Sequence, residues 1–541
     1  MTTAPLPNPS AVPGTPSTGI SAFGRWMALV AALLGWLFDG AEMGLFSMVG
    51  RSAIQDLLQF GTTPTPQQEG TIGLYFGIVI AMFLVGAATG GVLFGWLGDR
   101  IGRVRAMSLS VLTYAIFTGC CGFAQTPLQL AILRFIASLG MGGEWALGVA
   151  LVMEVWPNRS RGLMAGLIGA AANVGYMLVG FVGLGLMSIL TGVGQTLTNA
   201  GLSPETVASL VAFKGWRLLM ILGTTPALLT FFFRLFVPES EKWQHEQDRG
   251  ATSNWRAGDL LGVLIGAVGP ALIILVWSQD WSVTSPGSMI GQNLNAVRVG
   301  SIVFGLLIAT VGYTYPVVRY VQRSTLAGGN AAAWRPILNR MLLAAMLAGI
   351  ALLGTWASAQ WASAWAAKLT TSQVGSTARE WTQIWSATGA CVGTILAALA
   401  GDRFGRRITY FFLCLSSLAA SLWFYIGNSA YDNMFLFSVF LLGATTASFY
   451  GWLPLYLPEL FGTAVRATGQ GFGFNFGRIL AAIGALQAGV LTGMFPNGVN
   501  VVGVHVAGGY PAACSTMSLV YIVGLLVIWL APETHGKPLP E

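Results

Sequence analysis

Long apolar stretches follow one another along almost the whole chain, and this pattern constrains the fold more than any other feature. A helix needs about 20 apolar residues to cross the hydrocarbon layer of a membrane. Stretches of that length begin at Arg25 and recur to about residue 531. Of the 541 residues, 54% are apolar and only 9% are charged, whereas soluble domains carry about 25% charged residues. The sequence therefore predicts an all-α polytopic membrane protein and excludes a soluble enzyme.

The apolar stretches form two sets of six. The first set of predicted spans lies near residues 25–49, 71–97, 106–124, 128–153, 162–190 and 216–236. The second set lies near residues 340–366, 381–400, 408–427, 434–457, 467–493 and 514–531. Two further apolar stretches, near 259–277 and 298–321, fall between the sets. Because an even number of extra crossings leaves the orientation of the second half unchanged, we predict fourteen transmembrane helices.

These spans define the expected domains. They are a disordered cytoplasmic tail (1–24), an N-terminal six-helix bundle (25–237), a central linker holding an inserted two-helix hairpin (238–339), a C-terminal six-helix bundle (340–531) and a second cytoplasmic tail (532–541). Both flanks of the inserted pair are basic, so the hairpin is predicted from length and hydropathy and not from charge.

The distribution of basic residues predicts the orientation. When the N-terminus is placed inside, most of the 27 Lys and Arg residues fall on the cytoplasmic side, as the positive-inside rule requires. Both termini are therefore expected in the cytoplasm. The basic residues left on the outer side are Arg51, Lys214, Arg217, Arg298, Lys368 and Arg379.

Three short motifs recur in the same order in the two halves. They are Gly98-Asp99-Arg100-Ile101-Gly102-Arg103 and Gly401-Asp402-Arg403-Phe404-Gly405-Arg406; Glu154 with Arg161 and Glu459 with Arg466; and Pro238-Glu239-Ser240 and Pro532-Glu533-Thr534. Their spacing is nearly constant, which indicates a duplicated six-helix unit with pseudo-two-fold symmetry. Such internal repeats are typical of transporters whose substrate site lies between the two halves.

The repeated charges lie at helix ends that are expected to face the cytoplasm. Asp99 and Asp402 can cap a neighbouring helix or pair with adjacent arginines, and would thereby latch the two halves together. Alternatively, the arginines only fix the topology. The candidate residues of this cytoplasmic gate are Asp99, Arg100, Arg103, Glu154, Arg161, Asp402, Arg403, Arg406, Glu459 and Arg466.

Several of these motifs resemble those of a known family. Residues 95–103 resemble the loop signature between helices 2 and 3 of the major facilitator superfamily, and the resemblance covers nearly all of residues 25–537. Asp39-Gly40-Ala41-Glu42 is similar to the Asp-Gly-x-Asp motif of its aromatic-acid proton symporters, with Glu as the second acid. Residues 134–145 and 458–478 look closer to the sialate and lactate proton symporters.

The resemblance implies the major facilitator fold, with two six-helix bundles, and secondary active transport by alternating access. Fourteen helices depart from the twelve that are usual in these families. The motifs at Pro238 and Pro532 are shared with sugar porters, so they do not decide the substrate.

Five ionisable residues lie deep inside predicted spans: Asp39, Glu42, Arg134, Glu144 and Arg478. Each costs about 2.5–3.5 kcal/mol at a helix centre unless it is paired or hydrated, so such residues are functional candidates. Asp39 and Glu42 are three residues apart and share a helix face. The depths of Glu42 and Arg134 in the membrane are compatible with a contact.

In the symporters that the chain resembles, an acid on helix 1 and an arginine on helix 4 act in proton coupling. The resemblance therefore implies Asp39, Glu42 and Arg134 as the coupling residues, with Glu42 as the proton carrier. Alternatively, Glu42 and Arg134 form a static ion pair that holds helices 1 and 4 together.

Arg478 could bind a carboxylate in a bidentate manner, which favours an anionic substrate, or it could bond to groups within the bundle. Glu144 lies among small residues and is expected to bond to another helix. Other polar or amphipathic residues within spans could line the substrate site. Together with Arg478 and Glu144, the substrate-site candidates are Asn173, Tyr176, Gln360, Trp361, Gln383 and Tyr450.

The motifs of other function classes are missing from the sequence. There is no cluster of residues with metal-ligand spacing, no phosphate-binding loop and no nucleophile elbow. The basic residues form no continuous face for nucleic acid. We therefore expect no metal, no cofactor and no catalysis.

These observations predict a monomeric, proton-coupled symporter of a small organic anion, a monocarboxylate or sugar acid, in the inner (plasma) membrane. Its partners would be the substrate, the proton and the lipid bilayer. The alternatives are a sugar proton symporter, an uncoupled exchanger, and a transporter-like sensor that binds solute without moving it.

Overall fold

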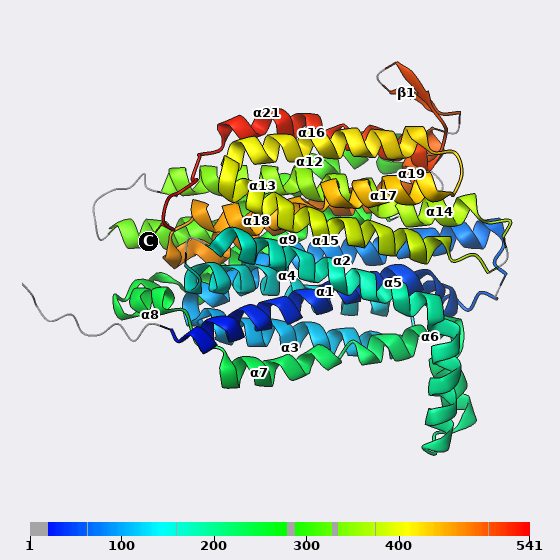
Figure 1. The fold of residues 1–541 in the computed structure, drawn as a ribbon, viewed down its shortest axis with the longest axis horizontal. Helices are drawn as coiled ribbons and strands as arrows, with labels where there is room; N and C mark the ends of the chain where they lie inside the picture. The colour runs from blue at the N-terminus through cyan, green and yellow to red at the C-terminus, as the bar shows by residue number, and fades with distance from the viewer. Residues whose placement is uncertain are drawn as a thin grey trace, which may run out of the picture.

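The computed structural model describes residues 20–540 except residues 62, 158–159, 279–286, 327–333, 374, 496 and 502. Most of the expected N-terminal tail, residues 1–19, and two parts of the central linker lie outside the described residues. Long helices run side by side along the longest axis of the molecule (Figure 1). The end of this bundle that carries the α2–α3 turn and the C-terminal residues is called the tail end here, and the other is called the far end.

The first half of the chain forms the six crossings expected there. Its helices are α1 (Ala22–Leu57), α2 (Pro66–Ile101), α3 (Arg103–Cys121), α4 (Pro127–Val155), α5 (Arg161–Asn199), α6 (Pro204–Leu222) and α7 (Leu229–Phe236). Polar residues and prolines fix several starts. Thr65 and Gln68 form a capping box at the start of α2, where Pro66 is the first residue. At the start of α4, the Thr126 side chain accepts from the Gln129 amide, and Pro127 is the first residue. These residues satisfy backbone N–H groups that a helix start leaves free.

The second half repeats the arrangement. Its helices are α13 (Trp334–Ala357), α14 (Ala362–Leu369), α15 (Ala378–Phe404), α16 (Arg406–Gly427), α17 (Asn433–Thr446), α18 (Phe449–Tyr456), α19 (Arg466–Met494), α20 (Tyr510–Ser518) and α21 (Val520–Val527). A short antiparallel hairpin of β1 (Val499–Val501) and β2 (Val504–Val506) lies between α19 and α20.

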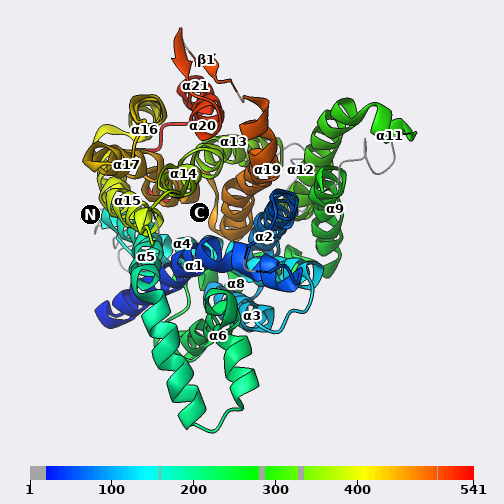
Figure 2. The ribbon, with the colours of Figure 1, turned by 90° about the vertical axis from the view of Figure 1, so that its right-hand side faces the viewer.

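The linker between the halves contains α8 (Glu241–Asp248), α9 (Leu260–Trp277), α11 (Met289–Gln292) and α12 (Leu294–Leu326). Helices α9 and α12 pack against each other and stand at one flank of the bundle, next to α2 and α19 (Figure 2). The Tyr313 hydroxyl on α12 shares a buried 2.7 Å hydrogen bond with Thr89 on α2. Ile274 of α9 packs with residues of α2, α4 and α19, so the inserted pair covers the line along which the two halves meet.

The structure is consistent with the predicted helix count. Within the described residues, thirteen helical segments are long and apolar enough to cross a membrane, including those of the inserted pair. Helix α19 occupies the place of the remaining predicted span, near residues 467–493. The all-α membrane fold is therefore confirmed.

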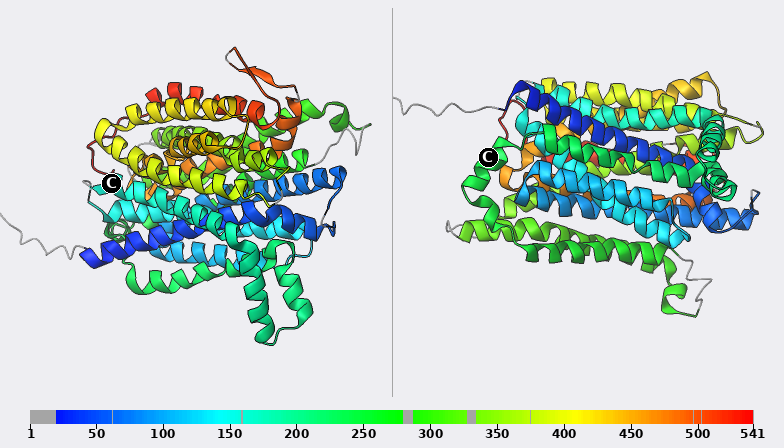
Figure 3. Two further views of the ribbon diagram at one scale, coloured as in Figure 1. Left: turned by 45° about the vertical axis from the view of Figure 1, so that its right-hand side comes forward. Right: turned by 90° about the horizontal axis from the view of Figure 1, so that it is seen from below.

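Several crossings predicted as single helices are broken. The predicted span at 216–236 is interrupted before Pro226, because proline lacks the N–H that a continuous helix requires. The predicted spans at 340–366 and 434–457 are interrupted near Ser358 and Ser448. Residues 191–212, which lie between two predicted spans, are mostly helical: they extend α5 and begin α6, and this pair projects sideways from the far end (Figure 3, left).

Candidate substrate site and gates

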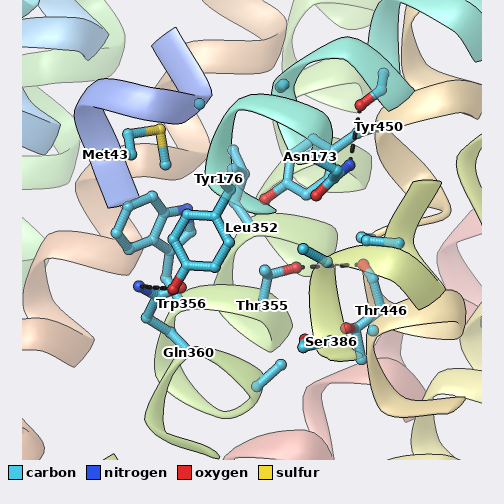
Figure 4. A pocket seen from close by; sticks show the side chains of 18 of the residues that line it. Met43, Asn173, Tyr176, Leu352, Thr355, Trp356, Gln360, Ser386, Thr446 and Tyr450 are labelled. Atoms are coloured by element: carbon cyan, nitrogen blue, oxygen red, sulfur yellow. Dashed lines mark hydrogen bonds between the residues drawn. The ribbon is translucent and has the colours of Figure 1, made fainter. Parts of the chain in front are cut away.

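A cavity lies at the centre of the bundle, between helices of the two halves. The centres of water molecules can occupy about 140 Å³ of it, enough space for several waters. Helices α1, α4 and α5 line one side, and α13, α14, α15, α17, α18 and α19 line the other. Side chains from both halves, such as Tyr176 and Gln360, face one another across it (Figure 4). The cavity is thus formed where the duplicated bundles face each other, as the internal repeat predicts.

Asp39 and Arg478 both line this cavity, from opposite halves of the chain. Their charges interact, and Glu144 adds a second acid beside Asp39. Among the described residues, Asp39 Oδ1, both carboxylate oxygens of Glu144 and Arg478 Nη1 are buried without a hydrogen-bond partner. An unsatisfied buried polar atom costs about 1–3 kcal/mol, so Asp39 and Arg478 present unbonded polar atoms at the cavity. Glu144 does not line the cavity, and its oxygens make no hydrogen bond to another helix within the described residues, contrary to the prediction.

Glu42 forms an ion pair with Arg134, as the sequence predicts from their depths. The Arg134 guanidinium also lies over the Phe46 and Phe83 rings, 4.3 and 4.5 Å from their centroids. Neither Glu42 nor Arg134 lines the cavity. The structure therefore separates the two acids of α1: Asp39 faces the cavity, and Glu42 lies in an aromatic environment between α1, α2 and α4.

Four of the remaining candidates line the cavity: Asn173, Tyr176, Gln360 and Tyr450 (Figure 4). Gln360 Nε2 lies 3.5 Å from the Tyr176 hydroxyl, and Asn173 Nδ2 donates to the Gly169 carbonyl of its own helix. Trp361 and Gln383 do not line the cavity. Trp361 stacks on Tyr510, and Gln383 Nε2 donates to the Tyr176 carbonyl oxygen at 2.8 Å.

Several side chains that line the cavity were not among the site candidates chosen from the sequence. They are Trp36, Met43, Trp145, Thr355, Trp356, Ser386 and Thr446. The Trp145 ring stacks on Phe474 of the other half, with centroids 3.7 Å apart. A tryptophan next to Glu144 in an otherwise small-residue segment is a signal that could have identified Trp145.

At the tail end, Asp99, Arg103 and Glu154 link the two halves. Asp99 accepts hydrogen bonds from the Ala467 and Thr468 amides at the start of α19, at 3.2 and 2.9 Å. Arg103 bonds Asp99, Glu154 and the Thr463 carbonyl. Arg466 donates to Glu154 at 2.7 Å. These buried contacts join α2 and α4 to α19, so the cavity is closed toward the tail end.

The equivalent residues of the second half make fewer contacts between the halves. Arg406 pairs with Glu459 at 2.7 Å within its own half. Asp402 lies 3.6 Å from Arg406, and Arg161 interacts with Glu459 through charge, with its Nε unbonded within the described residues. Arg100 and Arg403 are exposed and lie near the Trp96 and Phe404 rings. Neither forms an ion pair within the described residues.

The halves also touch on the far side of the cavity. Arg379 at the start of α15 donates to the Ser47 carbonyl oxygen of α1 at 2.6 Å. Gln360 Nε2 lies 3.4 Å from the Ser47 hydroxyl. The cavity is therefore bounded at both ends by contacts between the halves.

Comparison with known proteins agrees with this architecture. Residues 27–255 match the family described as "Sugar (and other) transporter". The chain is 26% identical to the cis,cis-muconate transport protein of Acinetobacter baylyi, covering 86% of this chain and 87% of that protein. It is also 26% identical to an inner membrane metabolite transport protein of Escherichia coli, over 95% of this chain and 93% of that protein.

Solved structures show the same fold. A proton:xylose symporter of the major facilitator superfamily, bound to 6-bromo-6-deoxy-D-glucose, superposes with a TM-score of 0.62 at 19% identity, covering 95% of this chain and 98% of the other. A human organic anion transporter superposes with a TM-score of 0.57 at 14% identity, covering 93% and 99% of the two chains. The similar proteins are transporters and not enzymes.

Proposed function

We propose that this chain, a solute transporter with the major facilitator fold that resembles the metabolite symporters, couples the uptake of a small organic anion to protons. The observation that carries the proposal is the meeting of Arg478 and Asp39 at one cavity between the halves, with Glu144 close enough to Asp39 for their charges to interact. Arg478 keeps an unbonded Nη1 there, and a guanidinium with free donors binds a carboxylate with good geometry.

The substrate is a monocarboxylate or a related acid with an apolar body. Trp36, Trp145 and Trp356 supply flat apolar surface, and Asn173 and Gln360 supply amide groups. This combination of apolar walls and a few polar groups is typical of small-molecule sites. The similarity to a muconate transport protein supports the choice of an organic acid.

The coupling proton is carried by Asp39, and Glu42 with Arg134 positions α1 against α4. Asp39 lines the cavity, where a substrate carboxylate would compete with it for Arg478. When Arg478 turns to the substrate, Asp39 loses its counter-charge and takes up a proton more readily. Glu42 retains its own arginine in the described structure, so it is expected to contribute through α1–α4 packing.

The first test is a ligand screen by thermal unfolding of the purified protein with lactate, benzoate, cis,cis-muconate and xylose. A ligand at a hundredfold its dissociation constant stabilises the folded state by about 2.7 kcal/mol. The acids should raise the melting temperature, and Arg478→Gln should abolish this effect. Stabilisation by xylose alone would overturn the choice of an anion.

The second test is uptake of the binding acid into proteoliposomes with an imposed pH gradient. Asp39→Asn should stop accumulation driven by the gradient but allow exchange of substrate across the membrane. Glu42→Gln is the matched variant on the same helix and should reduce the rate while accumulation persists. If only Glu42→Gln uncouples transport, the proton carrier is Glu42 and the proposed role of Asp39 is wrong.

A sugar proton symporter is the second candidate. The cavity-lining amides and indoles that favour an acid with an apolar body can also bind hydroxyls and sugar rings, and the chain has the fold of a xylose symporter.

The orientation with both termini in the cytoplasm and the monomeric state are part of the same proposal. Labelling of single cysteines from either side of the membrane tests the orientation.

A further inference from the structure

Four of the six basic residues assigned to the outer side gather around one place in the structure. Arg379 interacts electrostatically with Arg51 and Tyr510, and Lys214 interacts with Arg379. The Lys368 ammonium lies 6.0 Å from the Tyr510 ring centroid. These residues come from α1, α6, α14 and α15, so they are far apart in the sequence but share the far end of the bundle.

This basic group adjoins the cavity directly. Arg379 bonds the backbone oxygen of Ser47, and the Ser47 side chain lies within 3.4 Å of Gln360 Nε2. Gln360 lines the cavity together with Tyr176. One layer of side chains therefore separates Arg379 from the substrate cavity.

The position of Arg379 is unfavourable for its own helix. It lies in the first turn of α15, where the positive end of the helix dipole disfavours a cation by about 0.3–1 kcal/mol. Thr377 provides no side-chain cap at this helix start. Among the described residues, the acids that interact with this group are Glu69, which pairs with Arg51, and Glu380, so two carboxylates face four cations. A helix start and an excess of cations at one mouth both favour a bound anion.

We propose that Arg379, surrounded by Arg51, Lys214 and Lys368, forms a second carboxylate-binding site at the far mouth of the cavity, where an organic anion docks before it reaches Arg478. The proposal deepens the function proposed above and rests on it for the identity of the transported anion. A carboxylate makes a stronger, charge-assisted hydrogen bond than a neutral carbonyl. An anion that takes the Arg379 guanidinium therefore releases it from Ser47 and loosens the contact that closes this end.

The first experiment measures the local potential and needs no knowledge of the substrate. Thr371, exposed after α14, donates its hydroxyl to the Lys368 carbonyl oxygen. Thr371→Cys in the purified full-length protein is treated with an anionic (sulfonatoethyl) and a cationic (trimethylammonium-ethyl) methanethiosulfonate, and the protein without this cysteine gives the background. The anionic reagent should react about 10-fold faster, as expected for a cleft of one charge sign.

Two controls locate the effect. Adding Arg379→Gln should lower the ratio of the two rates about two- to fivefold, because one cation is removed near the thiol. Arg298→Gln removes the same charge from the flank of α12, where the guanidinium lies over Trp277, and should leave the ratio unchanged. Thr198→Cys, exposed on the projecting part of α5, should react with both reagents at similar rates. Equal rates at Thr371→Cys would overturn the proposal.

The second experiment tests carboxylate binding at the mouth. Benzoate or cis,cis-muconate should slow the anionic modification of Thr371→Cys at low ionic strength, and xylose should not. The protection should persist in Arg478→Gln, which blocks the inner site, and disappear in Arg379→Gln. If the protection is lost in Arg478→Gln and kept in Arg379→Gln, all anion binding occurs at the inner site and the proposal is wrong. Protection without uptake in proteoliposomes would instead overturn the proposed transport function and leave the mouth site standing.

Discussion

The two halves carry the same motif at the tail end but use it differently. Asp99, with its side chain fully buried, caps the first turn of α19 and binds Arg103. Asp402 is 35% exposed and lies 3.6 Å from Arg406. Likewise, Glu154 binds Arg103 and Arg466 from different halves, whereas Glu459 binds Arg406 of its own half.

This difference teaches that the duplicated motifs kept the same residues but do not make the same contacts between the halves. In the described conformation, the first copy holds the halves together, and the second copy stabilises the turn between α15 and α16. Because the contacts between the halves come chiefly from the first copy, they can break while the contacts of the second copy remain. Four experiments compare the copies, each with its counterpart as the control.

The largest expected difference is between Asp99→Ala and Asp402→Ala. Removing one partner of a buried charge network costs about 3–5 kcal/mol, whereas an exposed pair contributes about 0–1 kcal/mol. Asp99→Ala should also free the Ala467 and Thr468 amides, and hydrogen exchange at the start of α19 should accelerate. Similar exchange rates in the two variants would contradict the difference between the copies.

A double-mutant cycle measures the link that crosses the halves. Glu154→Gln and Arg466→Gln should be coupled by about 2 kcal/mol, since they remove a buried charged hydrogen bond of 2.7 Å. The equivalent cycle, Glu459→Gln with Arg161→Gln, should give a coupling below about 0.5 kcal/mol, because this pair makes only a charge interaction. Thermal unfolding of the four single and two double variants provides the values.

The turns of the two motifs contain glycines in a conformation that other residues avoid. Gly102 has φ 109° and ψ 154°, and Gly405 has φ 94° and ψ 161°. Alanine in this region costs about 1–3 kcal/mol. At Gly102 the added Cβ would also overlap the Glu239 carboxylate, while at Gly405 it would lie 3.1 Å from Glu533. Gly102→Ala should therefore lower the melting temperature more than Gly405→Ala. The reverse order would show that the Glu239 side chain moves away from the added methyl group at little cost.

The smallest effect concerns the acids that bind these turns. Burial raises the pKa of Glu239 above its ordinary value, and the backbone N–H groups of Ser240, Arg103 and Val104 only partly oppose it. Burial also acts to raise the pKa of Glu533, but N–H groups including those of Arg406 and Arg407 outweigh it and lower the pKa. The contributions of the two carboxyls to stability should therefore depend on pH with opposite signs.

Glu533 stabilises the protein above pH ~4.3, the value of a free glutamate, and this contribution is lost as the pH falls through its lower folded pKa. The contribution of Glu239 is present below pH ~4.3 and is lost as the pH rises through its raised folded pKa. In melting curves between acid and neutral pH, Glu239→Gln should remove a loss at the neutral end, and Glu533→Gln a loss at the acid end. Parallel profiles for the two variants would refute the opposite signs.

Much of the fold follows from the sequence because hydropathy reports a long apolar segment directly. Helices α9 and α12 lie close to the two apolar stretches between the halves, and the repeated motifs lie at helix ends. The breaks at Ser358 and Ser448 were missed because apolar residues continue through them. The helical part of 191–212 was not included in a predicted span because its Gly, Ser and Thr residues interrupt the apolar run.

The candidate site was predicted less completely. Asp39 and Arg478 line the cavity, but Glu42, three residues after Asp39, does not. Helix α1 is apolar on most of its surface, so its sequence cannot show which face turns to the other half. For the same reason Gln383 was a candidate, although its amide is used within the α5–α15 contact.

The inserted helices make the two seams of the molecule unequal. Where α2 meets α19, α9 and α12 form a protein wall outside the contact. Where α5 meets α15, side chains such as Phe181 and Leu396 are exposed and would touch acyl chains. In the proposed transport cycle, rocking of the halves would exchange side-chain contacts along one seam and lipid contacts along the other. Bilayer thickness and fluidity should consequently act on this carrier from a single flank.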